Sequence, residues 1–261
     1  MEEIPGRYFM DATREHMKLY REDLNGFRRP TVMFKLLGKR YKSQVCIMER
    51  HAEWIVGIID RKISLDFENF EEFENALMSC KKRFLIIDLR IISTFLGVAH
   101  QNLIIIDNKK KRIERFDPVG VKHMIHLSFS LLKKSPDKIL KEALLQIPKF
   151  EEYEYHKPKC YQKLFNIQMK ESMDVFSNRR NETKGFCQMW ALYLMHMKLL
   201  NPEKSTEDIL KYIRSRSSKT LHQKIRDYTA YWITTYQARR GDVRNARYLI
   251  ESANSKNSKK K

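Results

Sequence analysis

One segment constrains the fold of this chain more than any other. Residues 186–200 read FCQMWALYLMHMKLL, and at helical spacing their apolar side chains fall on nearly every face. A helix that is apolar all round is buried, so the rest of the chain has to surround it. Gly185 precedes the segment and Asn201-Pro202 follows it, as is typical of helix boundaries. We therefore predict a deeply buried helix over 186–200 at the centre of the core.

A second strong pattern is a hairpin over residues 98–120, VAHQNLIIIDNKKKRIERFDPVG, in which two apolar runs flank a polar centre. Short β-branched runs and helical spacings predict the other elements. Strands are expected at 45–48, 54–60, 84–92 and 151–158. Helices are expected within 1–29 (ended by Pro30), at 69–82, over 121–145 in two pieces split at 135–136, and at 205–214, 219–240 and 242–251. Strands early and helices late predict an α+β domain with a mixed sheet, its hairpin packed against the buried helix and its C-terminal part helical.

The length of 261 residues suits one domain with a small extension. We predict an N-terminal helical segment over 1–29, a main α+β domain over 30–251 with a basic helical part at 205–251, and a disordered Lys/Ser tail over 252–261.

The start of the chain, MEEIPGRYFM, has no cationic end followed by an apolar run, and the apolar stretches are too short to span a bilayer. A soluble intracellular protein is therefore expected. Its four cysteines, Cys46, Cys80, Cys160 and Cys187, are expected to be free thiols.

The net charge of +19 indicates polyanions or acidic surfaces as partners. Residues 203–261 carry 15 Lys and Arg against 6 Asp and Glu. Within them, RDYTAYWITTYQARR (226–240) places aromatic residues among basic ones, a composition that suits phosphate contacts and base stacking. A solvated basic helix face explains the same pattern. Nonspecific, salt-sensitive nucleic-acid binding is therefore an alternative expectation, either beside another activity or as the function of a non-enzymatic protein.

The hairpin brings a histidine and a carboxylate together. A two-residue turn at 108–109, or a four-residue loop over 107–110, pairs His100 directly with Asp117, with Cβ atoms about 4.5–5.5 Å apart. Glu114, the rival acid, falls on the opposite face. A carboxylate beside a histidine fixes its tautomer and stabilises the imidazolium that forms during catalysis.

Cys187 supplies the nucleophile for such a pair. It follows Gly185 and begins the buried helix, where the helix dipole and the first N–H groups favour a thiolate and suit an oxyanion. Alone, His100 suits a surface histidine, Asp117 a turn residue and Cys187 a small buried side chain. Together they predict a cysteine peptidase, a thiol hydrolase.

These residues carry a resemblance to a known family. The order His, Asp, Cys, on two strands and a helix start, resembles the SUMO-protease/adenovirus-proteinase superfamily, and the spacing of 17 from His100 to Asp117 is typical of its SUMO-protease branch. The phrases AHQNLIIID, RIERFDPVG and GFCQMWALYLMHMKLLNP resemble a divergent branch in large DNA viruses. The match covers about 98–120 and 185–202.

The resemblance implies a general base at His100, an orienting acid at Asp117 and a nucleophile at Cys187. It implies cleavage of a polyprotein or a ubiquitin-like conjugate, without a cofactor, in host cytoplasm or virion if the chain is viral. The family usually carries a Gln just upstream of the Cys as an oxyanion donor. Here the candidates are Gln168, then Gln162, then Asn181.

Two alternatives to peptidase chemistry remain. Bacterial effector acetyltransferases share the His-acid-Cys order, so acetyl transfer through a thioester on Cys187 is a rival reaction. Metal binding is the weaker alternative, because His123-x-x-His126 and His156-x-x-x-Cys160 have ligand-like spacings but neither completes a four-ligand pattern. We therefore predict no metal site and no membrane partner.

Overall fold

The fold rests on a mixed sheet. The computed structural model describes residues 1–24, 29–47, 55–59, 62–66, 70–93, 98–119, 136–157, 167–168, 170, 186–239 and three positions between 247 and 251. Within these residues seven strands form one sheet in the order β3-β2-β4-β5-β6-β7, with β1 also paired to β4. The strands are β1 (Val45–Ile47), β2 (Ile55–Ile59), β3 (Lys62–Asp66), β4 (Phe84–Ser93), β5 (Val98–Asp107), β6 (Arg112–Phe116) and β7 (Glu154–His156).

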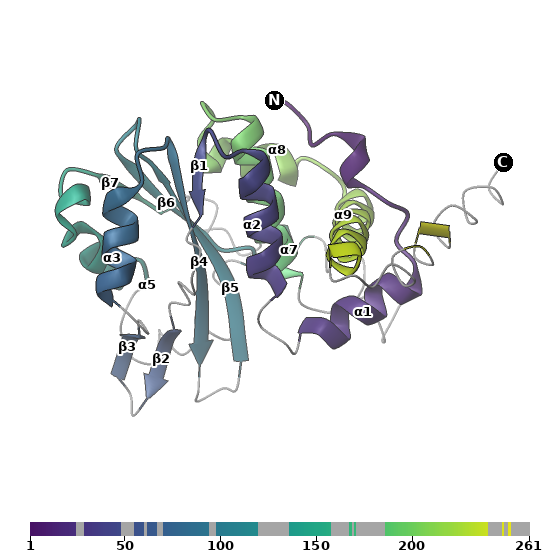
Figure 1. Cartoon of the computed structure of the whole chain (residues 1–261), viewed down its shortest axis with the longest axis horizontal. Helices are drawn as coiled ribbons and strands as arrows, with labels where there is room; N and C mark the ends of the chain where they lie inside the picture. The colour runs from purple at the N-terminus through teal and green to yellow at the C-terminus, as the bar shows by residue number, and fades with distance from the viewer. Residues whose placement is uncertain are drawn as a thin grey trace.

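Helices cover both faces of this sheet (Figure 1). They are α1 (Arg14–Leu24), α2 (Arg29–Arg40), α3 (Phe70–Ser79), α5 (Pro136–Leu145), α7 (Cys187–Leu200), α8 (Thr206–Arg214) and α9 (Ser218–Arg239), with short 3₁₀ turns η1 (Gly6–Tyr8) and η2 (Pro148–Phe150). One face packs against α3 and α5, and the other against α2, α7, α8 and α9. The predicted α+β class is confirmed. The predicted helix over 121–135 and most of the one over 242–251 lie outside the described residues.

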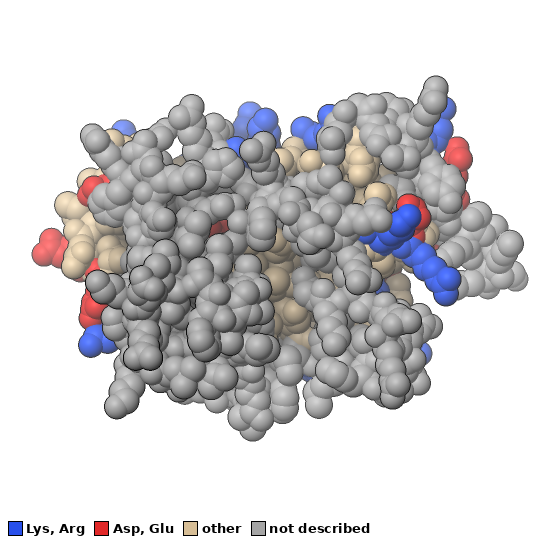
Figure 2. Space-filling view, turned by 90° about the horizontal axis from the view of Figure 1, so that it is seen from below, with Lys and Arg blue, Asp and Glu red and all other residues tan. Residues whose placement is uncertain are grey.

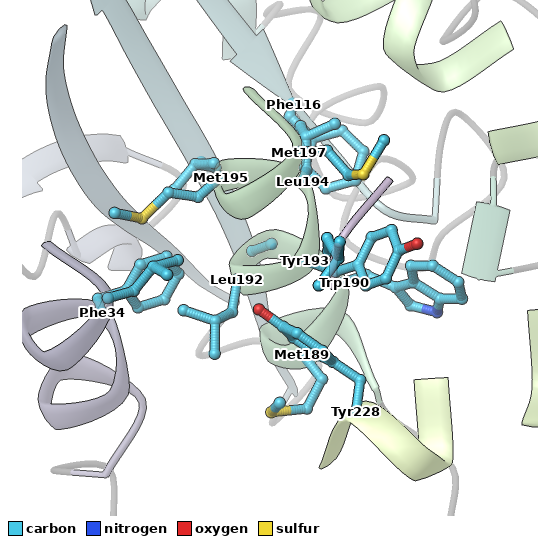
Figure 3. Packing of buried hydrophobic residues seen from close by; sticks show 14 of the residues in the cluster. Phe34, Phe116, Met189, Trp190, Leu192, Tyr193, Leu194, Met195, Met197 and Tyr228 are labelled. Carbon is cyan, nitrogen blue, oxygen red and sulfur yellow. The ribbon is translucent and has the colours of Figure 1, made fainter. Parts of the chain in front are cut away.

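The buried helix predicted from the sequence is α7. Its residues from Met189 to Leu199 are buried, and Trp190 and Leu194 are fully enclosed. Figure 3 shows the α7 side chains between Phe34 of α2, Phe116 of β6 and Tyr228 of α9. Each large apolar side chain buried in this way stabilises the fold by about 1.5–3 kcal/mol.

The N-terminal residues belong to the same core. Tyr8 of η1 is buried, and its ring contacts the ring of Trp232 in α9. The prediction that Pro30 ends the first helices is wrong, because Pro30 lies in the first turn of α2. Proline is well suited to that turn, where a backbone N–H has no acceptor within the helix.

The hairpin forms, but its register differs from the predicted one. Asp107 pairs with Arg112 across the turn, so the loop is residues 108–111. Asp107 Oδ1 accepts hydrogen bonds from the backbone N–H groups of Lys109 (3.1 Å) and Lys110 (3.2 Å). Lys111 closes the turn with a φ of 48°, in the left-handed region. The side chain of Asp107 thus stabilises a four-residue loop over 108–111, in place of the predicted turn at 108–109 or loop over 107–110.

This change of register moves the pairing by two residues. A shift of two keeps every side chain on its predicted face, because side chains alternate with a period of two. His100 and Asp117 therefore become diagonal neighbours instead of a directly opposed pair.

The cysteines also differ from the prediction. Cys46 of β1 and Cys80, which directly follows α3, form a disulfide with Cα atoms 6.1 Å apart. The parallel pairing of β1 with the start of β4 brings the two segments together, although 34 positions separate them in sequence. Cys187 is in no disulfide with a described cysteine, as predicted, and Cys160 lies outside the described residues.

No helix in the described part of the chain is long and apolar enough to cross a membrane. The most buried one, α7, has 14 residues.

Candidate active site

The site begins with a buried histidine and carboxylate. His100 lies near the start of β5, and Asp117 directly follows the end of β6. Their side chains meet with His100 Nε2 2.7 Å from Asp117 Oδ1, and both residues are almost completely buried. Burial at this distance holds the imidazole in one orientation.

Asp117 is itself held from two directions. Its Oδ1 accepts the backbone N–H of Val119 at 3.0 Å, in the manner of an Asx turn over Pro118. Its Oδ2 lies 3.5 Å from Nη1 of Arg115. The carboxylate of Asp117 therefore both stabilises the turn and contacts His100.

Arg115 links Asp117 to a wider polar network. Its side chain is buried, and its Nε and Nη2 donate to the two carboxylate oxygens of Asp137 in α5, at 2.8 and 3.1 Å. Nη1 of Arg115 also donates to Asn102 Oδ1 at 2.5 Å, and the Tyr155 hydroxyl donates to Asp137 at 2.9 Å. The guanidinium lowers the pKa of Asp137 against the effect of burial, so this ion pair is charged.

Cys187 completes the constellation as the first residue of α7. Its side chain is half-buried, and the Sγ atom is hydrogen-bonded to the side chain of His100. Because Nε2 of His100 faces Asp117, Nδ1 is the ring nitrogen left for the sulfur. The backbone N–H groups of Gln101 and Gln188 also donate to the sulfur.

The local fold explains these two backbone donors. Gln188 lies in the first turn of α7, where backbone N–H groups have no acceptor within the helix. The residue before the helix, Phe186, has no side-chain acceptor that could take their place. Gln101 lies beyond the last β5–β6 pair, Leu103 with Phe116. Its N–H is therefore not taken by the described part of β6.

The electrostatics favour a thiolate–imidazolium pair. Burial lowers the pKa of His100, but the charge and hydrogen bond of Asp117, with a smaller contribution from Cys187, raise it to about 10. Burial raises the pKa of the Cys187 thiol, whereas His100 and the N–H groups of Gln101 and Gln188 bring it below its ordinary value. A sulfur in this state is a nucleophile at neutral pH.

The structure brings together the three residues chosen from the sequence and separates the rival acid from them. Glu114 accepts a hydrogen bond from the hydroxyl of Thr206 and lies 3.6 Å from Lys198, on the α7 side of the sheet. Arg115 is not among the residues selected from the sequence. Residues 115 and 117 share one face of the predicted strand, and this alternation could have indicated that Arg115 lies beside Asp117.

Gln168 lies close to this site. Its backbone N–H donates to the carbonyl oxygen of Pro118 at 3.0 Å, and Pro118 is the residue that follows Asp117. Its side-chain Oε1 is buried and has no hydrogen-bond partner among the described residues. The other two oxyanion candidates, Gln162 and Asn181, lie outside the described residues.

The described residues contain no group of three or more His, Cys, Asp or Glu side chains that could hold a metal ion. His156 lies 2.6 Å from a carboxylate oxygen of Glu154. His123, His126 and Cys160 lie outside the described residues.

Two of the four aromatic side chains of α9 are in no position to stack on bases, whereas Tyr231 and Tyr236 are half-buried. Tyr228 and Trp232 are buried in the core, with 0% and 3% of their surface exposed. Lys and Arg side chains on the face seen in Figure 2 lie at several separate places. Base stacking on Tyr228 or Trp232 would require them to leave the core.

Comparison with known proteins gives remote likenesses. No family model matches the chain, and no curated protein matches it in sequence. Among solved structures, the Chlamydia trachomatis effector protein Cdu1 bound to ubiquitin is 11% identical with a TM-score of 0.46, over 80% of this chain and 93% of that one. The Chlamydia trachomatis effector ChlaDUB1 is 12% identical with a TM-score of 0.44, over 96% of both chains. A de-sumoylating protease is 11% identical with a TM-score of 0.40, over 92% and 93%. At these scores the functional argument rests on the site itself.

Proposed function

We propose that this chain is a cysteine peptidase that hydrolyses amide bonds through Cys187, His100 and Asp117. The observation that carries the proposal is the continuous contact from sulfur to imidazole to carboxylate, with 2.7 Å between His100 and Asp117. The lowered pKa of Cys187 gives the nucleophile, and the raised pKa of His100 gives the acid that a leaving amine requires.

The reaction follows from these charges. The Cys187 thiolate attacks the scissile carbonyl carbon and forms a C–S bond, while the carbonyl oxygen takes the negative charge. The C–N bond then breaks, and His100 gives its proton to the departing amine, which leaves a thioester on Cys187. Water attacks this thioester as His100 takes its proton, and the C–S bond breaks to release a carboxylic acid and restore the thiolate with its imidazolium.

Backbone N–H groups are suited to the oxyanion. The N–H group of Gln188, at the start of α7, donates to the sulfur and lies at the positive end of the helix dipole. The side-chain amide of Gln168, held beside Pro118, is proposed as a further donor. Its nitrogen would have to approach the carbonyl oxygen when substrate binds.

The substrate class we propose is a ubiquitin-like conjugate, with a polyprotein as the second candidate. The resemblance of residues 98–120 and 185–202 to SUMO-proteases supports the first choice. The net charge of +19 favours a substrate with acidic surface.

The proposal is tested with substrates in which ubiquitin or SUMO carries a fluorogenic amide at its C-terminus. We expect release of the fluorophore by the wild-type protein, abolition in Cys187→Ala, and full retention in the control His156→Ala, which changes a histidine outside the site. Activity that survives Cys187→Ala would overturn the proposal. Transfer of acetyl from acetyl-CoA to a protein without amide hydrolysis would identify the same triad as an acetyltransferase.

A further inference from the structure

A basic pocket lies far from the candidate active site. It has a volume of about 570 Å³ and runs along α2 toward β1 and the end of α9. Its walls carry five cationic side chains, from Lys35, Lys39, Lys42, Lys82 and Arg239. Val32 and Leu36, both half-buried, provide apolar surface between them.

The five cations come from separate parts of the chain. Lys35, Lys39 and Lys42 follow one another at helical spacing along α2 and the turn after it, so they share one face. Lys82 precedes β4 and donates to the backbone carbonyl of Lys42, while Arg239 ends α9. The fold therefore brings Lys82 and Arg239, which are distant in sequence, beside the three lysines of α2 and the turn after it.

No acid offsets these charges in the described part of the chain. The described walls of the pocket contain no Asp or Glu, and none of the five cations forms an ion pair with a described carboxylate. Like charges at helical spacing, such as Lys35 and Lys39, destabilise a helix by a few tenths of a kcal/mol. The C-terminal end of the α2 dipole favours Lys39, but it does not account for Lys82 and Arg239.

We propose that this pocket binds a small molecule that carries two or more phosphates on an apolar body, the chemistry of a nucleoside di- or triphosphate. The volume lies within the range of small-molecule sites, about 300–1,000 Å³. Several ammonium groups and a guanidinium around one concavity match a run of phosphate oxygens. Val32 and Leu36 match an apolar ring beside the phosphates. A concave pocket fits such a molecule better than a nucleic-acid strand, which needs an extended groove.

The pocket is separate from the catalytic residues. Val45 pairs with Phe84 at one end of β4, whereas His100 pairs with Ile91 seven positions along the same strand. At about 3.3 Å per residue these places are about 23 Å apart. The ligand is therefore proposed as an effector or tether and takes no part in the amide hydrolysis.

The test measures binding directly and does not depend on peptidase activity. Isothermal titration of the full chain with AMP, ADP, ATP and inorganic tripolyphosphate should show affinity that rises with the number of phosphates, and tighter binding of ATP than of tripolyphosphate. The variant Lys39→Gln/Lys42→Gln removes two exposed cations from the pocket. Each lost charge-assisted contact should weaken ATP binding about tenfold.

The matched control is Lys141→Gln/Lys219→Gln, which removes the same charge from two exposed positions outside the pocket. It should bind ATP as the wild type does. Equal weakening in both double variants would show general charge attraction and overturn the proposal. It would also be overturned if a single-stranded oligonucleotide bound through Lys39 and Lys42 while ATP did not, because the site would then be a nucleic-acid groove.

Discussion

Replacing His100 with alanine removes the cation that faces the sulfur of Cys187. The side chain of His100 is the first of the groups that lower the pKa of this thiol, and burial works against it. Without the imidazolium, burial dominates and the pKa of Cys187 rises. At a fixed pH the thiolate fraction therefore falls, and the rise of reactivity with pH moves to higher pH.

The size of this effect follows from the contact that is lost. A hydrogen bond to a charged group contributes about 1.5–3 kcal/mol, which corresponds to about 10- to 100-fold less thiolate. A thiolate of higher pKa is intrinsically more nucleophilic, with a Brønsted coefficient of about 0.4–0.5, so about half of the logarithmic loss is recovered. Alkylation of Cys187 should therefore slow by about three- to tenfold in His100→Ala.

The assay is alkylation by iodoacetamide between about pH 5 and pH 9, followed by mass spectrometry of the peptide that contains Cys187. Because each cysteine is read from its own peptide, alkylation of Cys187 is measured separately from alkylation of Cys160. The variant His156→Ala is the control, because His156 pairs with Glu154 on β7 and makes no described contact with Cys187. Equal rates in the wild type and His100→Ala would refute the proposed activation of the thiol.

Three further substitutions test the role of Asp117, the Arg115–Asp137 ion pair and the burial of α7. Asp117→Asn should lower kcat for the fluorogenic amide by about 10⁴-fold, as expected when a triad carboxylate becomes an amide, and unchanged kcat would exclude Asp117 as the orienting group. Arg115→Met should lower the free energy of unfolding in urea by about 3–5 kcal/mol, because Asp137 and the buried Asp117 lose the guanidinium that faces both, and adding Asp137→Leu should restore part of the loss. Leu194→Ala should cost about 2–5 kcal/mol by the same assay, whereas the exposed Met78→Ala should change stability by less than about 0.5 kcal/mol; equal costs would contradict the burial of α7.

Much of this arrangement is predictable from the sequence, because it depends on how apolar residues repeat along a helix and on which side chains share one face of a strand. The all-apolar spacing of residues 186–200 predicts the buried helix α7, and the structure places it at the centre of the core. His100 and Asp117 share a face of the sheet in both the predicted and the observed pairing. The two pairings differ by two residues, and side chains along a strand alternate with a period of two, so the predicted face is correct.

The remaining features depend on tertiary geometry. The register follows from the side chain of Asp107, which accepts two N–H groups of the turn. The Cys46–Cys80 disulfide follows from strand pairing between segments that are distant in sequence. The donors at Gln101 and Gln188 act through backbone N–H groups, so their side-chain identities give no signal.

The central claim is that Cys187 forms a covalent intermediate with the substrate. The most direct measurement is rapid acid quenching of the reaction with the fluorogenic ubiquitin-like substrate, followed by intact and peptide mass spectrometry. We expect a transient adduct on Cys187 that neutral hydroxylamine removes, as it removes a thioester, and that is absent from Cys187→Ala. Hydrolysis without an adduct on Cys187, or with an adduct on Cys160, would contradict it.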